Sequence, residues 1–133
     1  MKEIGGYLGL EALSGQEFYH DLIGVNSGRN ALLYILKARK IRKLYIPLFL
    51  CDSVRELCNR EGYCFEEYQI DTQFLPVFDQ TLKSDEYLYI VNFYGQLPDD
   101  QIVAMKARWE NIIVDNVQAF FHKPIPEVDT VYS

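Results

Sequence analysis

The sequence lacks a long hydrophobic run and an excess of basic residues, and each absence excludes a class of protein. Nowhere in the 133 residues does an apolar stretch approach the ~20 residues that span a bilayer, so a membrane protein is not expected. The net charge is −6, and no basic stripe is present that could replace the counterions of a nucleic acid. The sequence therefore predicts neither a membrane nor a nucleic-acid partner.

Cysteine and histidine are also scarce and poorly spaced for a disulfide framework or a metal centre. The three cysteines, Cys51, Cys58 and Cys64, are odd in number and form no C-x-x-C pair, which predicts reduced thiols. His20 and His122 have no further ligand at metal-binding spacing, so we expect structural or surface roles for both. The N-terminal segment mixes acids and glycines with its apolar residues and makes a poor signal peptide, so we expect a cytoplasmic protein.

What the sequence does contain is typical of a globular domain. Hydrophobic residues make up 49% of the chain, aromatic residues 14% and charged residues 24%. This supply of apolar side chains is enough for a buried core and argues against disorder. The length fits a single domain over residues 1–133.

Helical and strand patterns alternate along the chain. Helical periodicity predicts a helix over 31–39 with Ser27 as its N-cap, and a second helix from Asp52, as N-cap, to about Arg60 with Gly62 closing it. A proline and two acids at 98–100 predict the start of a third helix. Short apolar runs predict strands at 43–47, 64–70, 87–93 and 111–115, and another that begins at 130.

This alternation predicts an α/β fold with a mostly parallel sheet flanked by helices. Ligands of such sheets bind at the carboxyl ends of the strands. Polar residues and glycine collect at the predicted strand ends, in 47–52, 92–95, 115–118 and at Ser133.

Two of these features could hold a charged ligand. Gly28 and Arg29 precede the first predicted helix, where free backbone N–H groups and the helix dipole suit a phosphate, although Ser-Gly is also an ordinary helix cap. Asp115 closes a buried strand, where a carboxylate could hold a pyridine nitrogen protonated or simply cap a turn. The residues alone leave both alternatives open.

Five segments in one order resemble motifs of the DegT/StrS-type aminotransferases, which depend on pyridoxal phosphate (PLP). SGRNAL resembles their S-G-T-A-A-L phosphate loop, and VNFYGQLPD resembles V-H-x-Y-G-x-P-x-D. IIVDNVQAFF resembles I-x-D-x-A-Q-A-x-G, YIPLFLCDSV resembles the P-x-x-T-[aromatic] strand, and VDTVYS resembles the strand before F-S-F-x-x-x-K. The matches span residues 27–133, and the resemblance implies part of the large domain of a PLP-dependent aminotransferase-like fold.

The resemblance also implies roles for individual residues at the cofactor ring. Asp115 would pair with the pyridine nitrogen, and Gln118 would lie near the ring and its 3-hydroxyl group. Cys51 falls where the family places an aromatic residue that stacks on the ring, so either Phe49 or another residue would take that part or the ring would be held less firmly. The residues after Gln118 are bulkier than is usual in the family.

Three further residues would bind the phosphate group of the cofactor. Gly28 and Arg29 would offer backbone N–H groups, and Ser133 would add a hydroxyl. Arg29 replaces the usual threonine, so its guanidinium could take over as a direct phosphate ligand. In the family the lysine that forms the Schiff base follows the position of Ser133 by a few residues. None of the seven lysines here fits that position, so we expect no catalytic residue in this chain.

The function implied by the resemblance is amino transfer, usually from glutamate, to a nucleotide-linked keto-sugar, in a homodimer. We expect the 133-residue chain, ending before that lysine, to be catalytically incompetent by itself. One alternative is a non-catalytic α/β module that binds another ligand or pairs with a partner. A receiver-like or flavodoxin-like domain is a weaker alternative, because a receiver carries its acidic cluster after the first strand and not near the end.

Overall fold

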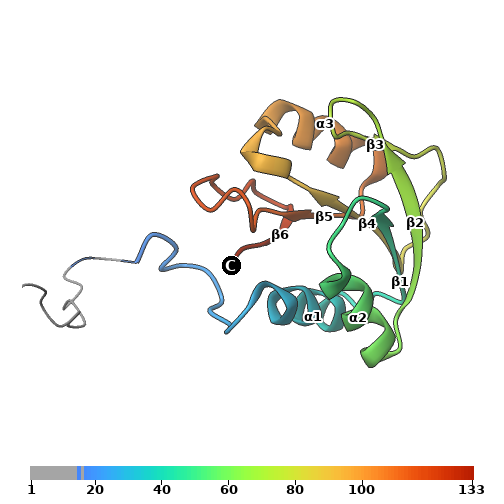
Figure 1. Ribbon diagram of the computed structural model, residues 1–133. Coiled ribbons are helices and arrows are strands. Elements are labelled where there is room, and N and C mark those ends of the chain that lie inside the picture. Colours follow the sequence, from blue (N-terminus) through green and yellow to red (C-terminus); the bar gives the residue numbers. More distant parts are fainter. Residues whose placement is uncertain (1–14, 16) are drawn as a thin grey trace, which may run out of the picture.

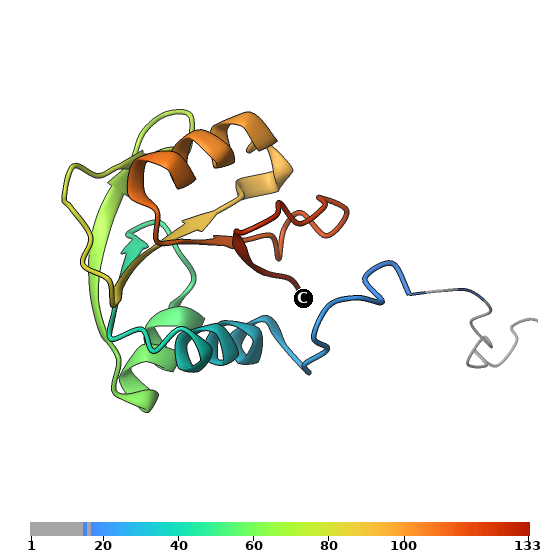
Figure 2. The same ribbon diagram turned by 180° about the vertical axis from the view of Figure 1, so that it is seen from behind.

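The computed structural model describes residue 15 and residues 17–133, which form a sheet covered by helices on both faces (Figures 1 and 2). The signal-peptide argument and Lys2 lie outside these described residues. Within this part of the chain, no helix is long and apolar enough to cross a bilayer.

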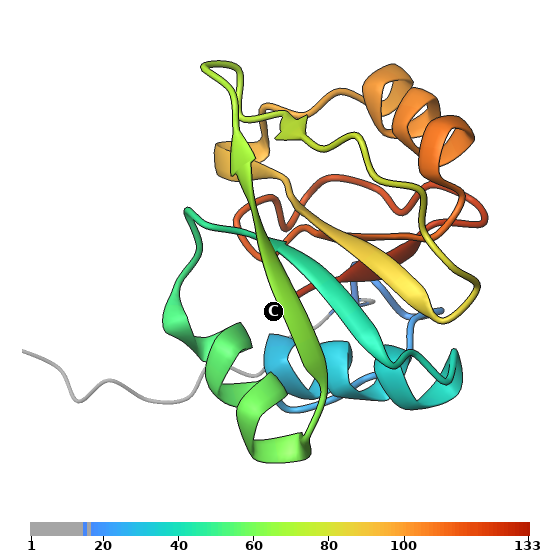
Figure 3. The same cartoon turned by 90° about the vertical axis from the view of Figure 1, so that its right-hand side faces the viewer.

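In the described part of the chain, the sheet has six strands in the order β3-β2-β1-β4-β5-β6. All neighbouring strands run parallel except β3, which pairs antiparallel with β2 at one edge. Figure 3 shows the sheet from the side of β2, with the strands twisting relative to one another. The predicted α/β fold with a mostly parallel sheet is confirmed. The strands are β1 (Lys43–Pro47), β2 (Cys64–Ile70), β3 (Pro76–Val77), β4 (Glu86–Val91), β5 (Ile112–Asp115) and β6 (Asp129–Val131).

Helices α1 (Gly28–Ala38) and α2 (Asp52–Glu61) cover one face of the sheet, and α3 (Asp99–Trp109) covers the other (Figure 1). Strand residues alternate between the two faces, so Leu44 and Ile46 pack in the core on the α1–α2 side while Tyr45 packs on the α3 side. Because both faces are covered, β4 and β5 consist largely of buried residues, as their apolar runs predict.

The helix boundaries differ from prediction at their N-termini. Ser27 is the N-cap of α1, and its hydroxyl accepts the Asn30 N–H at 3.3 Å, so the helix begins at Gly28, earlier than predicted. The prediction that Asp52 caps α2 is wrong. Cys51 holds the N-cap position, and Asp52 lies in the first turn, where an acid suits the helix dipole. Gly62 closes α2 with φ 76°, as predicted.

The strand predictions fail mainly at the carboxyl ends, where the chain leaves the sheet. β4 ends at Val91, because Phe93–Gly95 turn into a 3-10 helix in which Tyr94 has φ 56°. β6 ends at Val131, before the predicted strand end at Ser133. The two-residue strand β3 was not predicted, since it is too short to carry a pattern.

Candidate functional site

The site is built where β5 ends, at a buried carboxylate. Asp115 is the last residue of β5 and is 9% exposed. Its Oδ2 accepts the Tyr89 hydroxyl at 2.6 Å, and its Oδ1 accepts the Val117 N–H at 2.8 Å. Burial raises the pKa of Asp115, and the two hydrogen bonds lower it in part. The carboxylate is therefore fixed in place, and a cationic group beside it would favour its charged form.

The first turn of α1 meets the chain that follows Asp115. A β-carbon on Gly28 would lie 3.0 Å from Cγ2 of Val117, 3.4 Å from Cβ of Ser133 and 3.6 Å from Cγ1 of Val131. Val131 is in turn the register partner of Asp115 across β5 and β6. The structure thus brings Gly28, Ser133 and the segment after Asp115 to one end of the sheet, on the side covered by α1.

This helix start has the features of an anion site. The first N–H groups of a helix lack carbonyl partners within it and carry the positive end of its dipole. Gly28 and Arg29 lie in this first turn, and the Arg29 side chain is exposed. Val117 and Ser133 approach Gly28 so closely that a side chain there would crowd them.

Cys51 and Phe49 lie in the loop between β1 and α2, at another part of the same edge. The Cys51 thiol is exposed, and its sulfur lies 2.8 Å from the Ser53 hydroxyl. Burial raises the pKa of Tyr89 well above its ordinary value, and the charge of Asp115 raises it further. The Phe49 ring packs on Phe93 with centroids 5.6 Å apart.

Gln118 joins the turn after β4 to the turn after β5. Its side-chain Oε1 accepts the Tyr94 N–H at 3.2 Å. The Cβ position of Gly95 lies 3.5 Å from Cβ of Ala119, so the two turns are in direct contact. Gln118 therefore lies at the same end of the sheet as Asp115, and part of its hydrogen-bonding capacity is already used by the protein.

A buried amide network beside Asp115 was missed by sequence reasoning. Asn92 donates to Oδ1 of Asn116 at 3.0 Å and accepts the Leu97 N–H at 2.9 Å. The Asn116 amide contacts Nδ1 of His122 at 3.2 Å and the Tyr132 hydroxyl at 3.2 Å. The signal was present, because an asparagine directly follows each of two buried strands and must find partners there.

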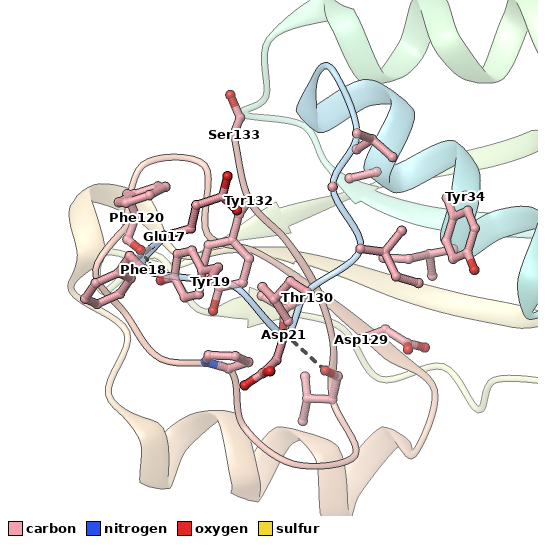
Figure 4. A pocket seen from close by; sticks show the side chains of 18 residues that line it. Glu17, Phe18, Tyr19, Asp21, Tyr34, Phe120, Asp129, Thr130, Tyr132 and Ser133 are labelled. Atoms are coloured by element: carbon pink, nitrogen blue, oxygen red, sulfur yellow. Dashed lines mark hydrogen bonds between the residues drawn. The ribbon is translucent and has the colours of Figure 1, made fainter. Parts of the chain in front are cut away.

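A hollow borders this site without containing Asp115 or Gly28. It has a volume of about 760 Å³ and lies between the segment 17–25, α1 and β6 (Figure 4). Ser133 lines its edge, so the hollow and the predicted site share that residue. Aromatic rings form one wall, among them Phe18, Tyr19, Phe120 and Tyr132.

No lysine of the described residues forms a hydrogen bond or an ion pair with Asp115, whose partners are Tyr89 and Val117. Lys43 binds Glu66 at 2.7 Å at the start of β1, the end of the sheet opposite to Asp115. Lys123 lies 3.7 Å from the centroid of the Phe18 ring. Lys37 lies in the last turn of α1, whose first turn borders the site. Within residues 15 and 17–133, no group of three metal-ligating side chains is present either.

Three solved structures share this arrangement of strands and helices. 3-Amino-5-hydroxybenzoic acid (AHBA) synthase superimposes with a TM-score of 0.55 at 17% identity, covering 71% of this chain and 27% of the synthase. A DegT DnrJ EryC1 StrS aminotransferase from Brucella abortus gives 0.52 at 18% identity, covering 71% and 30% of the two chains. This chain has an aminotransferase-type fold.

An aminotransferase from Psychrobacter cryohalolentis agrees, with a TM-score of 0.52, 19% identity and coverage of 70% of this chain and 26% of that one. The chain thus spans less than a third of the length of each of these proteins. No family model and no curated protein matches the sequence. The aminotransferase-type fold predicted from the five motifs is confirmed at the level of structure.

Proposed function

We propose that residues 1–133 are the N-terminal part of the PLP-binding large domain of an aminotransferase that acts on a nucleotide-linked keto-sugar. The observation that carries the proposal is that the start of α1 lies close to the carboxyl end of β5. There Val117 contacts Gly28 and donates its N–H to Asp115. An anion-binding helix start and a buried acid at one sheet end suit a ligand with a phosphate at one end and a basic ring nitrogen at the other.

The residues present fit the phosphate end of this cofactor. The missing side chain at Gly28 lets Val117 and Ser133 lie directly against the helix start. The backbone N–H groups of Gly28 and Arg29 would bind the phosphate oxygens, and the Ser133 hydroxyl would add a further donor. The exposed guanidinium of Arg29 has the charge and donors to act as an additional phosphate ligand.

The residues around Asp115 fit the ring end. When bound, PLP supplies an electron sink for amino-transfer chemistry. Asp115 would hold a proton on the ring nitrogen, because an ionised carboxylate beside that nitrogen stabilises its protonated form. Gln118 would lie near the ring and its 3-hydroxyl group, and Cys51 would lie where the family places the aromatic residue that stacks on the ring.

We further propose that this chain by itself does not catalyse amino transfer. The catalytic step requires a lysine amine at the cofactor, and no described lysine bonds Asp115; Lys43 binds Glu66, and Lys123 lies over the Phe18 ring. The complete enzyme would use an amino donor and the keto-sugar in the cytoplasm, as a homodimer. Full turnover by the chain alone, with PLP, glutamate and a nucleotide-linked keto-sugar, would overturn the proposed incompetence.

Binding of pyridoxamine 5′-phosphate tests the cofactor site directly. This form has no aldehyde, so surface lysines cannot capture it covalently. We expect titration of the ¹⁵N-labelled chain to shift the amide signals of Gly28, Arg29 and Val117, and Asp115→Ala to weaken binding about tenfold or more. If only the signals of residues that line the hollow, such as Tyr19 and Tyr132, shift, or if none shift, the proposal is contradicted.

A second candidate is the non-catalytic module, and exposed aromatic residues favour it. Phe121 is 77% exposed and packs edge-on against Phe18 and Phe120. Exposed apolar patches of this kind mark surfaces that associate with other chains. A chain that binds no pyridoxamine 5′-phosphate but self-associates would support this candidate over the first.

A further inference from the structure

Tyr89 is a polar side chain in the middle of a buried apolar strand. It lies in β4, and its side chain is 2% exposed. A buried phenol needs a hydrogen-bond partner, since leaving its hydroxyl unsatisfied costs free energy. Its neighbours in the strand, Leu88 and Ile90, are apolar.

The strand register explains how Tyr89 reaches the site. Tyr89 is the partner of Ile113 across β4 and β5, and Asp115 is the partner of Val91. Asp115 therefore lies two residues further along the sheet on the same face, a rise of about 6.6 Å. The long phenol spans this distance, and its oxygen comes to 2.6 Å from Oδ2 of Asp115.

We propose that Tyr89 is a positioning residue for Asp115, holding Oδ2 so that the carboxylate keeps one orientation toward the end of the sheet. The Val117 N–H holds the other oxygen, so the two donors together fix the plane of the carboxylate. Each oxygen retains a lone pair for a ligand N–H. The consequence for a cofactor ring rests on the proposed function, whereas the effect on Asp115 itself does not.

Few other titratable groups among the described residues influence the pKa of either member of the pair. The influences on Asp115 are burial, Tyr89 and Val117, with no other charged side chain of the described residues among them. Cys51, from the loop before α2, and Tyr68, from β2, act electrostatically on Tyr89. The Tyr68 hydroxyl donates to the backbone carbonyl of Tyr89 at 2.8 Å and is buried.

Tyr68 supplies a matched control, because it is a second buried tyrosine that does not bond Asp115. The carboxyl pKa of Asp115 is measured by ¹³C NMR in the wild type, Tyr89→Phe and Tyr68→Phe. We expect Tyr89→Phe to raise this pKa, since the hydroxyl stabilises the ionised form, and Tyr68→Phe to leave it unchanged. Equal titration of Asp115 in all three proteins would overturn the inference.

The affinity for pyridoxamine 5′-phosphate separates this inference from the proposed function. If the wild type binds, the acid limb of its affinity profile should move to higher pH in Tyr89→Phe and stay in place in Tyr68→Phe. A profile that does not move in Tyr89→Phe would count against the positioning role. If the wild type does not bind, the proposed function fails, and the ¹³C titration still decides the role of Tyr89.

The wild type offers a measurement that needs no variant, should Tyr89→Phe fail to fold. The Tyr89 hydroxyl proton is buried and hydrogen-bonded, so we expect it to exchange slowly with solvent and to be visible by NMR. Its chemical shift should follow the titration of Asp115. A hydroxyl proton that does not respond to that titration would refute the positioning role.

Discussion

The position of a β-carbon on Gly28 lies 3.0 Å from Cγ2 of Val117, although the two residues are far apart in the sequence. Val117 also donates its N–H to Asp115, so one residue links the helix start to the buried acid. This contact holds the start of α1 next to the carboxyl end of β5.

Gly28→Ala is expected to weaken phosphate-group binding at the α1 start. The added methyl would crowd Val117 and Ser133, which must then shift by a few tenths of an ångström. We expect at least a severalfold loss of affinity for pyridoxamine 5′-phosphate with little change in the free energy of unfolding, because alanine favours the helix. Gly24→Ala is the matched control, since a β-carbon there meets nothing within 4 Å. Unchanged affinity in Gly28→Ala would argue against this site.

Asp115→Asn is expected to remove a pH dependence from stability. The pKa of Asp115 is raised in the folded state, so the folded protein binds more protons than the unfolded chain above the unfolded value of 3.8. The free energy of unfolding therefore falls as pH rises from that value through the folded pKa.

This contribution is absent in Asp115→Asn, so its unfolding free energy relative to wild type should increase across the same range. Denaturant unfolding of both proteins at a series of pH values from about 4 to 7 measures the difference. A difference that stays constant with pH would show that burial does not raise this pKa.

Arg55 is expected to hold the loop that carries Phe49 and Cys51. Its guanidinium donates to the carbonyls of Leu48 at 2.8 Å and Leu50 at 2.7 Å, and to Glu67 at 2.5 Å. Arg55→Met should lower the free energy of unfolding by about 2 kcal/mol, because these acceptors lose a charged donor. Urea unfolding measures the loss.

Arg60→Met is the control for this loop prediction. Arg60 is exposed and pairs only with its neighbour Glu61 among the described residues, so its replacement should change stability by less than about 0.5 kcal/mol. Arg55→Lys should recover only part of the loss, since an ammonium cannot form the same fork of bonds. Equal stability of Arg55→Met and Arg60→Met would mean that the loop does not depend on the guanidinium.

Phe121→Ser is expected to reduce self-association while leaving the fold intact. The ring is 77% exposed and belongs to the aromatic group with Phe18 and Phe120. Removing it should lower the apparent mass in light scattering at high protein concentration, because less apolar surface is available for contact. Val103→Ser removes an exposed apolar residue from α3, the helix on the face of the sheet opposite to α1 and α2. This variant should leave the apparent mass unchanged. The same mass in Phe121→Ser as in the wild type would place the contact elsewhere.

Local patterns predicted most of the fold because they are short-range properties of the chain. β1 and β2 have the predicted bounds, since each is an extended run ended by a turn or helix signal. The glycine at 62 was recognisable as a helix stop because few other residues tolerate its positive φ. The cap of α2 was missed, because Cys51 takes the N-cap position without a side-chain hydrogen bond.

The candidate site was predictable only in its parts. Strand-end polarity pointed to Asp115, and the helix start pointed to Gly28, but each had an ordinary structural explanation. Tyr89 and Asn116 were not singled out, because their partners lie on other strands and no local pattern reports them. Both residues could have been recognised as polar residues that lie within, or directly after, a buried apolar strand.

The sequence by itself determined the alternation of elements, and with it the mostly parallel sheet, because hydrophobic periodicity and turn residues act over a few neighbouring positions. The tertiary structure alone decided that Tyr89 bonds Asp115 and that Gly28 touches Val117. Those contacts depend on strand order and register. Both are set by how the whole core packs, and no single segment contains that information.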